Sequence, residues 1–357
     1  MSLETTSGSR LLISTAAFVV VVAGMRAAES LIVLLLLSIF IAIISAPTLF
    51  WLHRKGLPKL VAMLLVIVAL AGVGLLLSVL IGTSIDDFSR SLPVYKEQLQ
   101  EHTSGLVTWM NARGIALPAD MVKENLNLGS AMSLAAKVFS SLSNLLANAF
   151  FILLTVIFIL LEASSFPGKL KLIFKDPESS MAHFNHLMEN VNRYVAMKSW
   201  MSLLTGGIIA VYLWILGVDY ALLWGMLAFV LNFVPNIGSI IAAIPAVLLA
   251  FVQGGTSLAL FTIAGYAAVN IGIGNVLEPK IMGKGLGLST LVVFLSLVFW
   301  GWVLGPVGML LSVPLTMVAK VALESEQQTH WIAVLLGSEA DVKAEEAQGK
   351  EKDSDQS

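Results

Sequence analysis

The sequence predicts an all-α polytopic membrane protein with about eight transmembrane helices, some of them broken or re-entrant in the C-terminal half. The chain of 357 residues is 57% hydrophobic and 12% charged, whereas a soluble globular protein carries about 25% charged residues. Its mean hydropathy is +0.87. Only five Lys, Arg, Asp or Glu residues fall between Ser199 and Leu323. That stretch cannot present a water-soluble surface and must lie in lipid.

Eight apolar runs have the length of a membrane span, which is about 20 residues. They lie at residues 11–28, 31–51, 59–84, 138–161, 196–216, 221–250, 257–276 and 289–320. We expect the first to be a retained span and not a signal peptide, because Arg26 stands where small residues would mark a cleavage site. The sixth and eighth runs exceed a hydrocarbon core of about 30 Å, so each is expected to be tilted, broken or folded back. Prolines mark the expected places: Pro235, Pro245, Pro306 and Pro314.

Glycine is concentrated in the same half of the chain, with 16 of 28 glycines between Ser199 and Leu323. One interpretation is close helix packing, for which Gly301 and Gly305 form a GxxxG pair. The other is broken helices, because backbone at membrane depth leaves helical geometry only inside protein or beside a water-filled cavity. The glycines accompany prolines and polar residues, which favours broken helices.

Two polar segments and an acidic tail divide the chain. The expected parts are an N-terminal three-span part at 1–85, an extracytoplasmic amphipathic helical segment at 86–137, a C-terminal core at 138–323 with a cytoplasmic helical segment at 162–195, and an acidic, largely disordered cytoplasmic tail at 324–357. Asp176 and Pro177 are typical of an N-cap and the first helical position, so a helix is predicted to start there.

The orientation follows from the loop at residues 53–59, which carries three basic residues and no acidic one. Basic residues in short loops stay in the cytoplasm. With eight spans, both termini are then cytoplasmic.

The first candidate site lies in the sixth run. Asn232, Asn236 and Ser239 are spaced four and three residues apart, which places them on one face of a helix. Pro235 removes a backbone donor, so the helix should kink or open just before Gly238. Amides and freed carbonyls there suit a dehydrated cation or a polyol. The alternative is that the Asn side chains only bond to neighbouring helices.

The second candidate site contains Asn275, Glu278, Pro279 and Lys280 between apolar runs. A charged group inside a membrane is costly, and its presence therefore suggests a function. Glu278 is a candidate proton or cation carrier. The alternative is a polar interfacial turn in which Glu278 and Lys280 are solvated, and the spacing allows either a short loop or a shallow re-entrant hairpin.

Several classes of function are excluded or unsupported. The chain has no cysteine, and no phosphate-binding loop pattern is present. The spans contain no histidine and no aspartate pair, so an intramembrane enzyme is not expected. We predict no catalytic residue, no metal, no cofactor and no nucleic-acid partner.

Three motifs resemble a known family when taken in order. They are Asn-Phe-Val-Pro-Asn-Ile-Gly-Ser at 232–239, Leu-Glu-Pro-Lys-Ile-Met-Gly at 277–283 and Phe-Trp-Gly-Trp-Val-Leu-Gly-Pro-Val-Gly-Met at 299–309, followed by Val-Pro-Leu at 313–315. They are similar to the autoinducer-2 exporter (AI-2E) family. The resemblance implies a multi-pass secondary transporter of the bacterial inner membrane that forms a homo-oligomer. Some members are credited with export of the signal autoinducer-2, and others with sodium(lithium)/proton antiport.

The leading hypothesis is therefore an exporter of a small polar solute, with Glu278 as its proton-coupled group. A sodium(lithium)/proton antiporter that uses Asn232 and Asn236 is the alternative. A non-transporting scaffold that binds partners through residues 86–137 is a third hypothesis. The expected partners are a small-molecule or ion substrate, the lipid bilayer and further copies of the chain.

Overall fold

The computed structural model describes residues 7–113, 148–163, 165, 168–169, 177–235, 237–282, 287–324 and 329–338, and its regular elements there are all helices. Five helical segments are long and apolar enough to cross a membrane: Glu29–Arg54, Lys59–Phe88, Met188–Ile215, Gly238–Ile281 and Thr290–Leu310. Three shorter apolar ones are Thr15–Ala27, Ala149–Glu162 and Ala221–Leu231. The predicted class of all-α polytopic membrane protein is confirmed.

Among the described residues, the N-terminal half contributes four helices. They are α1 (Ser7–Ala27), α2 (Glu29–Arg54), α3 (Lys59–Ala112) and α6 (Ala149–Glu162). The last three pack through a shared cluster that includes Leu49, Ala62 and Val156. The apolar span ends at Phe88, close to the predicted residue 84, and the same helix continues through Pro93 to Ala112. The fall in hydropathy after residue 84 comes from polar side chains, which do not interrupt the backbone hydrogen bonds of a helix.

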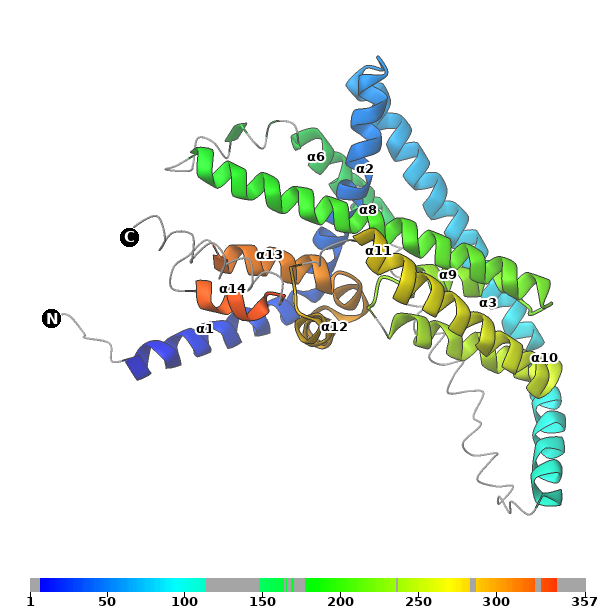
Figure 1. Cartoon of the computed structure of the whole chain (residues 1–357). Coiled ribbons are helices and arrows are strands. Elements are labelled where there is room, and N and C mark those ends of the chain that lie inside the picture. The colour runs from blue at the N-terminus through cyan, green and yellow to red at the C-terminus, as the bar shows by residue number, and fades with distance from the viewer. Residues whose placement is uncertain are drawn as a thin grey trace.

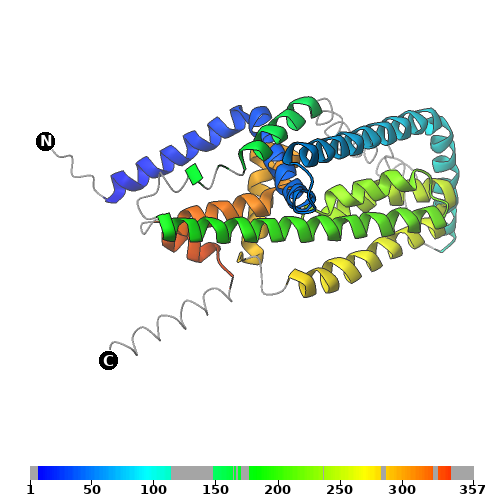
Figure 2. The ribbon, with the colours of Figure 1, turned by 90° about the horizontal axis from the view of Figure 1, so that it is seen from above.

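Helix α8 (Pro177–Ile215) is the longest element of the C-terminal half, with 39 residues. It begins at Pro177 as predicted, and Asp176 lies outside the described residues. Figure 2 shows α8 in green, running beside the lime and yellow helices that follow it.

The chain reverses direction after α8 through two residues with positive φ, Gly217 (73°) and Tyr220 (58°). Helix α9 (Ala221–Leu231) then runs back along α8. Their backbones touch at Gly206 and Gly225: a Cβ added to Gly225 would lie 2.7 Å from the Gly206 carbonyl oxygen and 2.5 Å from the Ala210 Cβ. Helix α9 has 11 residues, or about 17 Å, and stops about halfway across a hydrocarbon core.

Helix α10 (Gly238–Val269) is two antiparallel arms and not one long span. Gly255, with φ 66° and ψ −160°, lies at the reversal. Ser239 Oγ donates to Asn270 Oδ1 at 3.0 Å, and Gly255 lies about midway between these residues, as two arms folded together require. In Figure 1 the lime and yellow arms meet at the right-hand end of the molecule.

The sixth predicted span is therefore folded back: α9 and the first arm of α10 form a re-entrant hairpin, whose tip is residues 232–237. The expected break at Pro235 is confirmed. The expected break at Pro245 is wrong, because this proline is buried within the first arm. An interior proline kinks or breaks a helix unless neighbouring groups accommodate it.

The last helices follow the second arm of α10. They are η1, a π-helix (Asn270–Leu277), α11 (Glu278–Met282), α12 (Thr290–Leu310), α13 (Ser312–Glu324) and α14 (His330–Leu336). Gly305, with φ 62°, breaks α12 just before Pro306. Trp300 Nε1 donates to Thr316 Oγ1 at 3.0 Å, so α13 packs back on α12. The eighth predicted span is also folded back.

The end of the molecule at the α8–α9 turn is joined to α3. Tyr95 donates its hydroxyl proton to Asp219 Oδ2 at 2.9 Å, and the Asp219 N–H donates to Gln253 Oε1 at 3.2 Å. Burial, together with hydrogen bonds to Tyr220 and Asp219, raises the pKa of Tyr95. The Tyr95 hydroxyl therefore keeps its proton and remains a donor.

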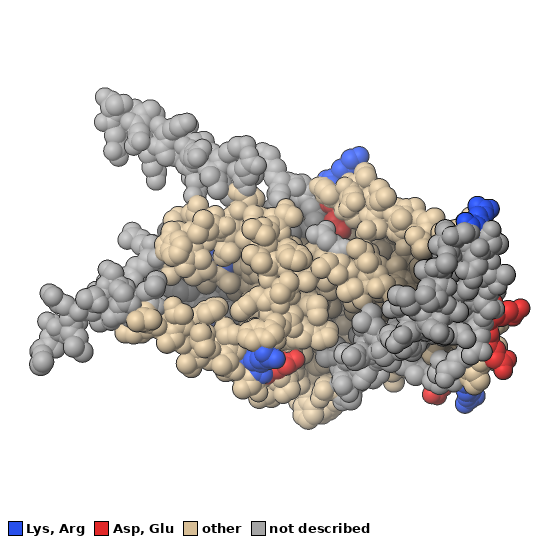
Figure 3. All heavy atoms as spheres, turned by 90° about the horizontal axis from the view of Figure 1, so that it is seen from below, with Lys and Arg blue, Asp and Glu red and all other residues tan. Residues whose placement is uncertain are grey.

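The outer surface is apolar over most of the helices. Trp214 (75% exposed), Phe150 and Leu335 (both 68%) are among many large exposed hydrophobic side chains. In the face shown in Figure 3, the described residues are mostly tan, with few acidic or basic side chains. A monomeric soluble protein rarely exposes a contiguous apolar patch larger than a few hundred Å², so this surface is suited to lipid.

The contact between α8 and α9 can be tested with two adjacent glycines. Gly206→Ala places a Cβ 2.6 Å from the Gly225 carbonyl oxygen, whereas Gly207 has nothing within 4 Å. We expect Gly206→Ala to lower the free energy of unfolding by about 1–3 kcal/mol. Gly207→Ala should be neutral or slightly stabilising, since Ala is the better helix former. Thermal unfolding of the purified proteins in detergent measures both. Equal effects at the two positions would show that the backbones do not touch.

Candidate functional site

A stripe of polar side chains runs along one buried face of α8. Lys198, Ser202 and Thr205 are spaced four and three residues apart, so they share a face, and all three are buried. Together they occupy about 10 Å of the helix axis. Each faces the elements that follow the α8–α9 turn.

Lys198 forms an ion pair with Glu278, the first residue of α11. Its Nζ donates to Glu278 Oε1 at 2.6 Å, and the two side chains are only 6% and 16% exposed. Tyr194, one turn before Lys198, is also buried. The pair joins α8 to α11, which follows the second arm of α10 through η1.

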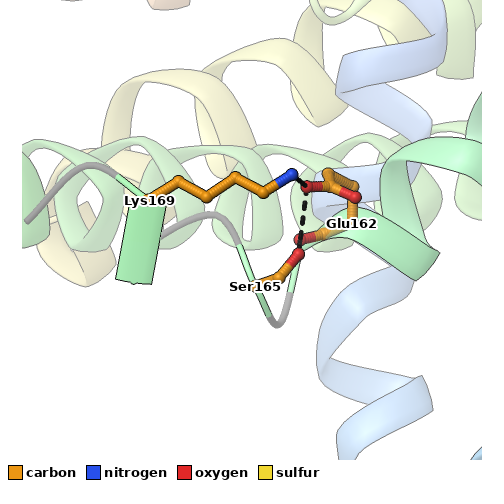
Figure 4. A network of polar contacts seen from close by, with 3 residues as sticks. All are labelled: Glu162, Ser165 and Lys169. Atoms are coloured by element: carbon orange, nitrogen blue, oxygen red, sulfur yellow. Dashed lines mark hydrogen bonds and ion pairs between the residues drawn. The ribbon is translucent and has the colours of Figure 1, made fainter. Parts of the chain in front are cut away.

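The other ion pairs among the described residues lie nearer the surface. In Figure 4, Glu162 accepts hydrogen bonds from Lys169 and Ser165, but the side chains of Glu162 and Lys169 are 51% and 64% exposed. Solvent screens such a pair, so it contributes little to stability. Breaking a buried pair such as Lys198–Glu278 is strongly destabilising, because loss of either partner leaves an uncompensated buried charge.

The backbone before Glu278 explains where its side chain lies. The chain widens into the π-helix η1, and the Glu278 N–H bonds to the carbonyl of Ile273, five residues earlier. Pro279 follows directly, and a proline ring clashes with the carbonyl four residues before it in an ordinary α-helix. The wider π-turn avoids that clash, and such turns are frequent at functional sites.

The hairpin tip is attached to its neighbours by neutral hydrogen bonds. Asn232 Nδ2 donates to Ser202 Oγ at 3.0 Å, and Ser239 donates to Asn270, as described above. Gly238 is packed against α9, since an added Cβ would lie 1.8 Å from the Leu231 carbonyl oxygen. Asn232 and Ser239 therefore each bond to a neighbouring element.

The remaining predicted residues are placed differently. Asn236 lies outside the described residues, and Pro235 is half-buried at the tip. Asn275, Pro279 and Lys280 are exposed. Of the segment at 275–287, which was expected to form a loop or a re-entrant hairpin, residues 275–282 are helical and not a loop. Residues 283–286 lie outside the described part of the chain.

Sequence reasoning missed the partners of these residues. Lys198, Ser202 and Thr205 lie within the predicted span at 196–216 and Asn270 within the span at 257–276, but none of the four was singled out. A signal was present: Lys198 is a positive charge at the start of an apolar run, as Glu278 is a negative charge between two such runs. A metal site is not indicated, because the described residues contain no group of three or more His, Asp or Glu side chains suited to a metal ion.

The fold and the buried polar stripe define a class: a multi-pass membrane protein with broken helices and a charge pair among the helices, which is typical of a transporter. The sequence profile of AI-2E family transporters matches residues 15–327. The chain belongs to the AI-2E transporter family, as the motifs predicted, and is a membrane transporter.

Named relatives cover nearly the full length. The chain is 40% identical to the AI-2 transport protein TqsA of Escherichia coli K12, over 93% of this chain and 96% of TqsA. It is 39% identical to a protein of Haemophilus influenzae that is provisionally named as a transport protein, over 94% of this chain and 98% of that one. It is 35% identical to YhhT of E. coli K12, also provisionally named as a transport protein, over 93% and 95% of the two chains.

The ion pair can be tested by a double-mutant cycle. Lys198→Met and Glu278→Gln each leave one buried charge unpaired, so each should lower the free energy of unfolding by about 3–5 kcal/mol. The double variant Lys198→Met/Glu278→Gln removes both charges and should recover most of that loss. Thermal unfolding in detergent provides the measurement, and Glu162→Gln in the exposed pair is the control, with little change expected. Additive losses in the double variant would contradict a direct pair.

Proposed function

We propose that the protein is a secondary transporter of the bacterial inner membrane that exports a small polar solute, driven by an ion gradient. The quorum-sensing signal autoinducer-2 is the first candidate solute. Membership of the AI-2E family and the name of the E. coli relative TqsA support this choice. The observation that carries the proposal is the Lys198–Glu278 ion pair, buried between two helices of the membrane-embedded half.

In the proposed mechanism, the proton gradient acts through protonation of Glu278 in the ion pair. When Glu278 takes up a proton, its carboxylate becomes neutral and the Coulomb attraction to Lys198 is lost. The contact between α8 and α11 then weakens, so these two helices can separate. Release of the proton restores the pair. A proton entering the cell would in this way be exchanged for a solute leaving it.

The orientation of the chain in the membrane is part of the same proposal. The basic loop at residues 53–59 supports a cytoplasmic location of both termini. The segment at 86–137 is then extracytoplasmic, and the segment at 162–195 and the tail at 324–357 are cytoplasmic. In this division, residues 1–85 form an N-terminal part and residues 138–323 form the transport core. A homo-oligomer also stays a prediction, from the family resemblance.

Flux measurements with purified protein test the proposal. In proteoliposomes with an acidic lumen, the wild-type protein should accumulate autoinducer-2 against its gradient, and collapse of the pH difference should stop accumulation. The Lys198→Met/Glu278→Gln variant should fold but transport no more than empty vesicles. Lys280→Gln is the matched control, because Lys280 is exposed two residues away, and it should transport at the wild-type rate. Undiminished flux in the double variant would exclude the proton switch.

A sodium(lithium)/proton antiporter is the second candidate. The Asn232 amide and the Ser202 hydroxyl that it contacts favour it, since oxygen ligands suit alkali cations, and Glu278 would again carry the proton. The same proteoliposomes, loaded with a pH-sensitive dye, distinguish the candidates. Proton release that depends on sodium or lithium, without movement of autoinducer-2, would support the antiporter. Absence of any flux would leave the scaffold hypothesis.

A further inference from the structure

The turn between α2 and α3 carries a cluster of basic side chains. Residues 53–59 contain three Lys or Arg residues, one histidine and no Asp or Glu. Arg54 ends α2, Lys55 follows it, and both side chains are exposed. In Figure 1 this turn lies at the top edge of the molecule, apart from the other labelled helices. The two cations therefore face outward from the protein.

The backbone of the turn is held without these two side chains. Gly56, with φ 97°, reverses the chain after α2. The Leu57 N–H then donates to the Leu52 carbonyl at 3.4 Å, which is the pattern of a Schellman C-cap. The turn closes through its own main-chain hydrogen bonds, so the charges of Arg54 and Lys55 are not needed to form it.

Acidic side chains do not neutralise the two cations among the residues that the structure describes. The ion pairs there do not include Arg54 or Lys55. Helix α6 packs beside α2, and Glu162 is at its end. This carboxylate already accepts hydrogen bonds from Lys169 and Ser165. The turn thus keeps a positive charge that a partner can use.

The turn also lies where a lipid headgroup would be. Two segments of membrane-spanning length, Glu29–Arg54 and Lys59–Phe88, meet there, so it marks one edge of the hydrocarbon core. Trp51 is 57% exposed, and the Lys55 Nζ lies 4.9 Å from the centre of its ring. Tryptophan is enriched at the boundary between membrane and water. Leu60 and Leu64, one turn apart on α3, are exposed apolar side chains that begin just beyond the bases.

This combination of groups matches one class of partner. Guanidinium and ammonium groups bind phosphate oxygens by charge-assisted hydrogen bonds, and basic residues next to a membrane span attract anionic lipids. A soluble anion would use the cations alone. A phospholipid also uses the apolar side chains of α3, because its acyl chains lie beside its headgroup phosphate.

We propose that the α2–α3 turn is a binding surface for an anionic phospholipid. Arg54 and Lys55 hold the headgroup, and its acyl chains lie against Leu60 and Leu64. The surface is separate from the Lys198–Glu278 pair and does not depend on the proposed transport function. It also goes beyond the use of the same loop to orient the chain, because it concerns a lipid that stays bound to the folded protein.

Native mass spectrometry of the purified full-length protein in detergent tests the surface. The probes are phosphatidylglycerol and phosphatidylcholine with the same acyl chains, and the wild-type protein should bind phosphatidylglycerol more tightly. Arg54→Gln/Lys55→Gln should weaken that binding about fivefold for each charge, or about 25-fold, and Arg54→Gln alone about fivefold. Arg193→Gln/Lys280→Gln is the matched control, because it removes two other exposed positive charges. It should leave the Kd unchanged.

The charge-conserving variant Arg54→Lys/Lys55→Arg should bind phosphatidylglycerol as the wild type does, and thermal unfolding in detergent checks that every variant is folded. Three results would overturn the proposal. They are equal affinity of the wild type for the two lipids, equal loss of affinity in the two double Gln variants, and displacement of phosphatidylglycerol by a similar concentration of inorganic phosphate. The last result would indicate a site for a free anion. None of these measurements requires flux.

Discussion

A helix that stops halfway across a hydrocarbon layer leaves polar groups where water cannot reach them, and the C-terminal half is arranged around this constraint. Helix α9 ends at Leu231, and the chain must then turn within the membrane. Such a turn is tolerated only where protein or a water-filled cavity surrounds it. Helix α8 provides that surrounding, because its buried polar face presents Ser202 to Asn232.

The same constraint accounts for the small residues around the hairpin. Polar side chains at its tip reach α8 only if the backbones come close, and a side chain at Gly206 or Gly225 would prevent this. Glycine at these positions provides packing, whereas Gly255 and Gly305 provide reversals with positive φ. The two interpretations of the glycine-rich half are therefore both correct, at different residues.

The sequence was sufficient to predict the class and the break at Pro235, and it singled out Glu278 as a candidate, because hydropathy, proline and a charge in an apolar run are local signals. It did not indicate that Lys198 is the partner of Glu278, since the two residues are 80 positions apart and only the fold brings them together. It also did not indicate that the third span and the helix after it form one continuous element, because hydropathy reports the boundary of the lipid and not the end of a helix.

In the proposed mechanism, charged and neutral residues occupy different parts of the buried face of α8. The charged member of its polar face, Lys198, lies toward α11, and the neutral members, Ser202 and Thr205, lie toward the hairpin. Lys198 lies about two helical turns from Thr205. In the proposed mechanism, protonation of Glu278 would therefore act on the contact between α8 and α11 and leave the neutral contacts of α8 with the hairpin unchanged.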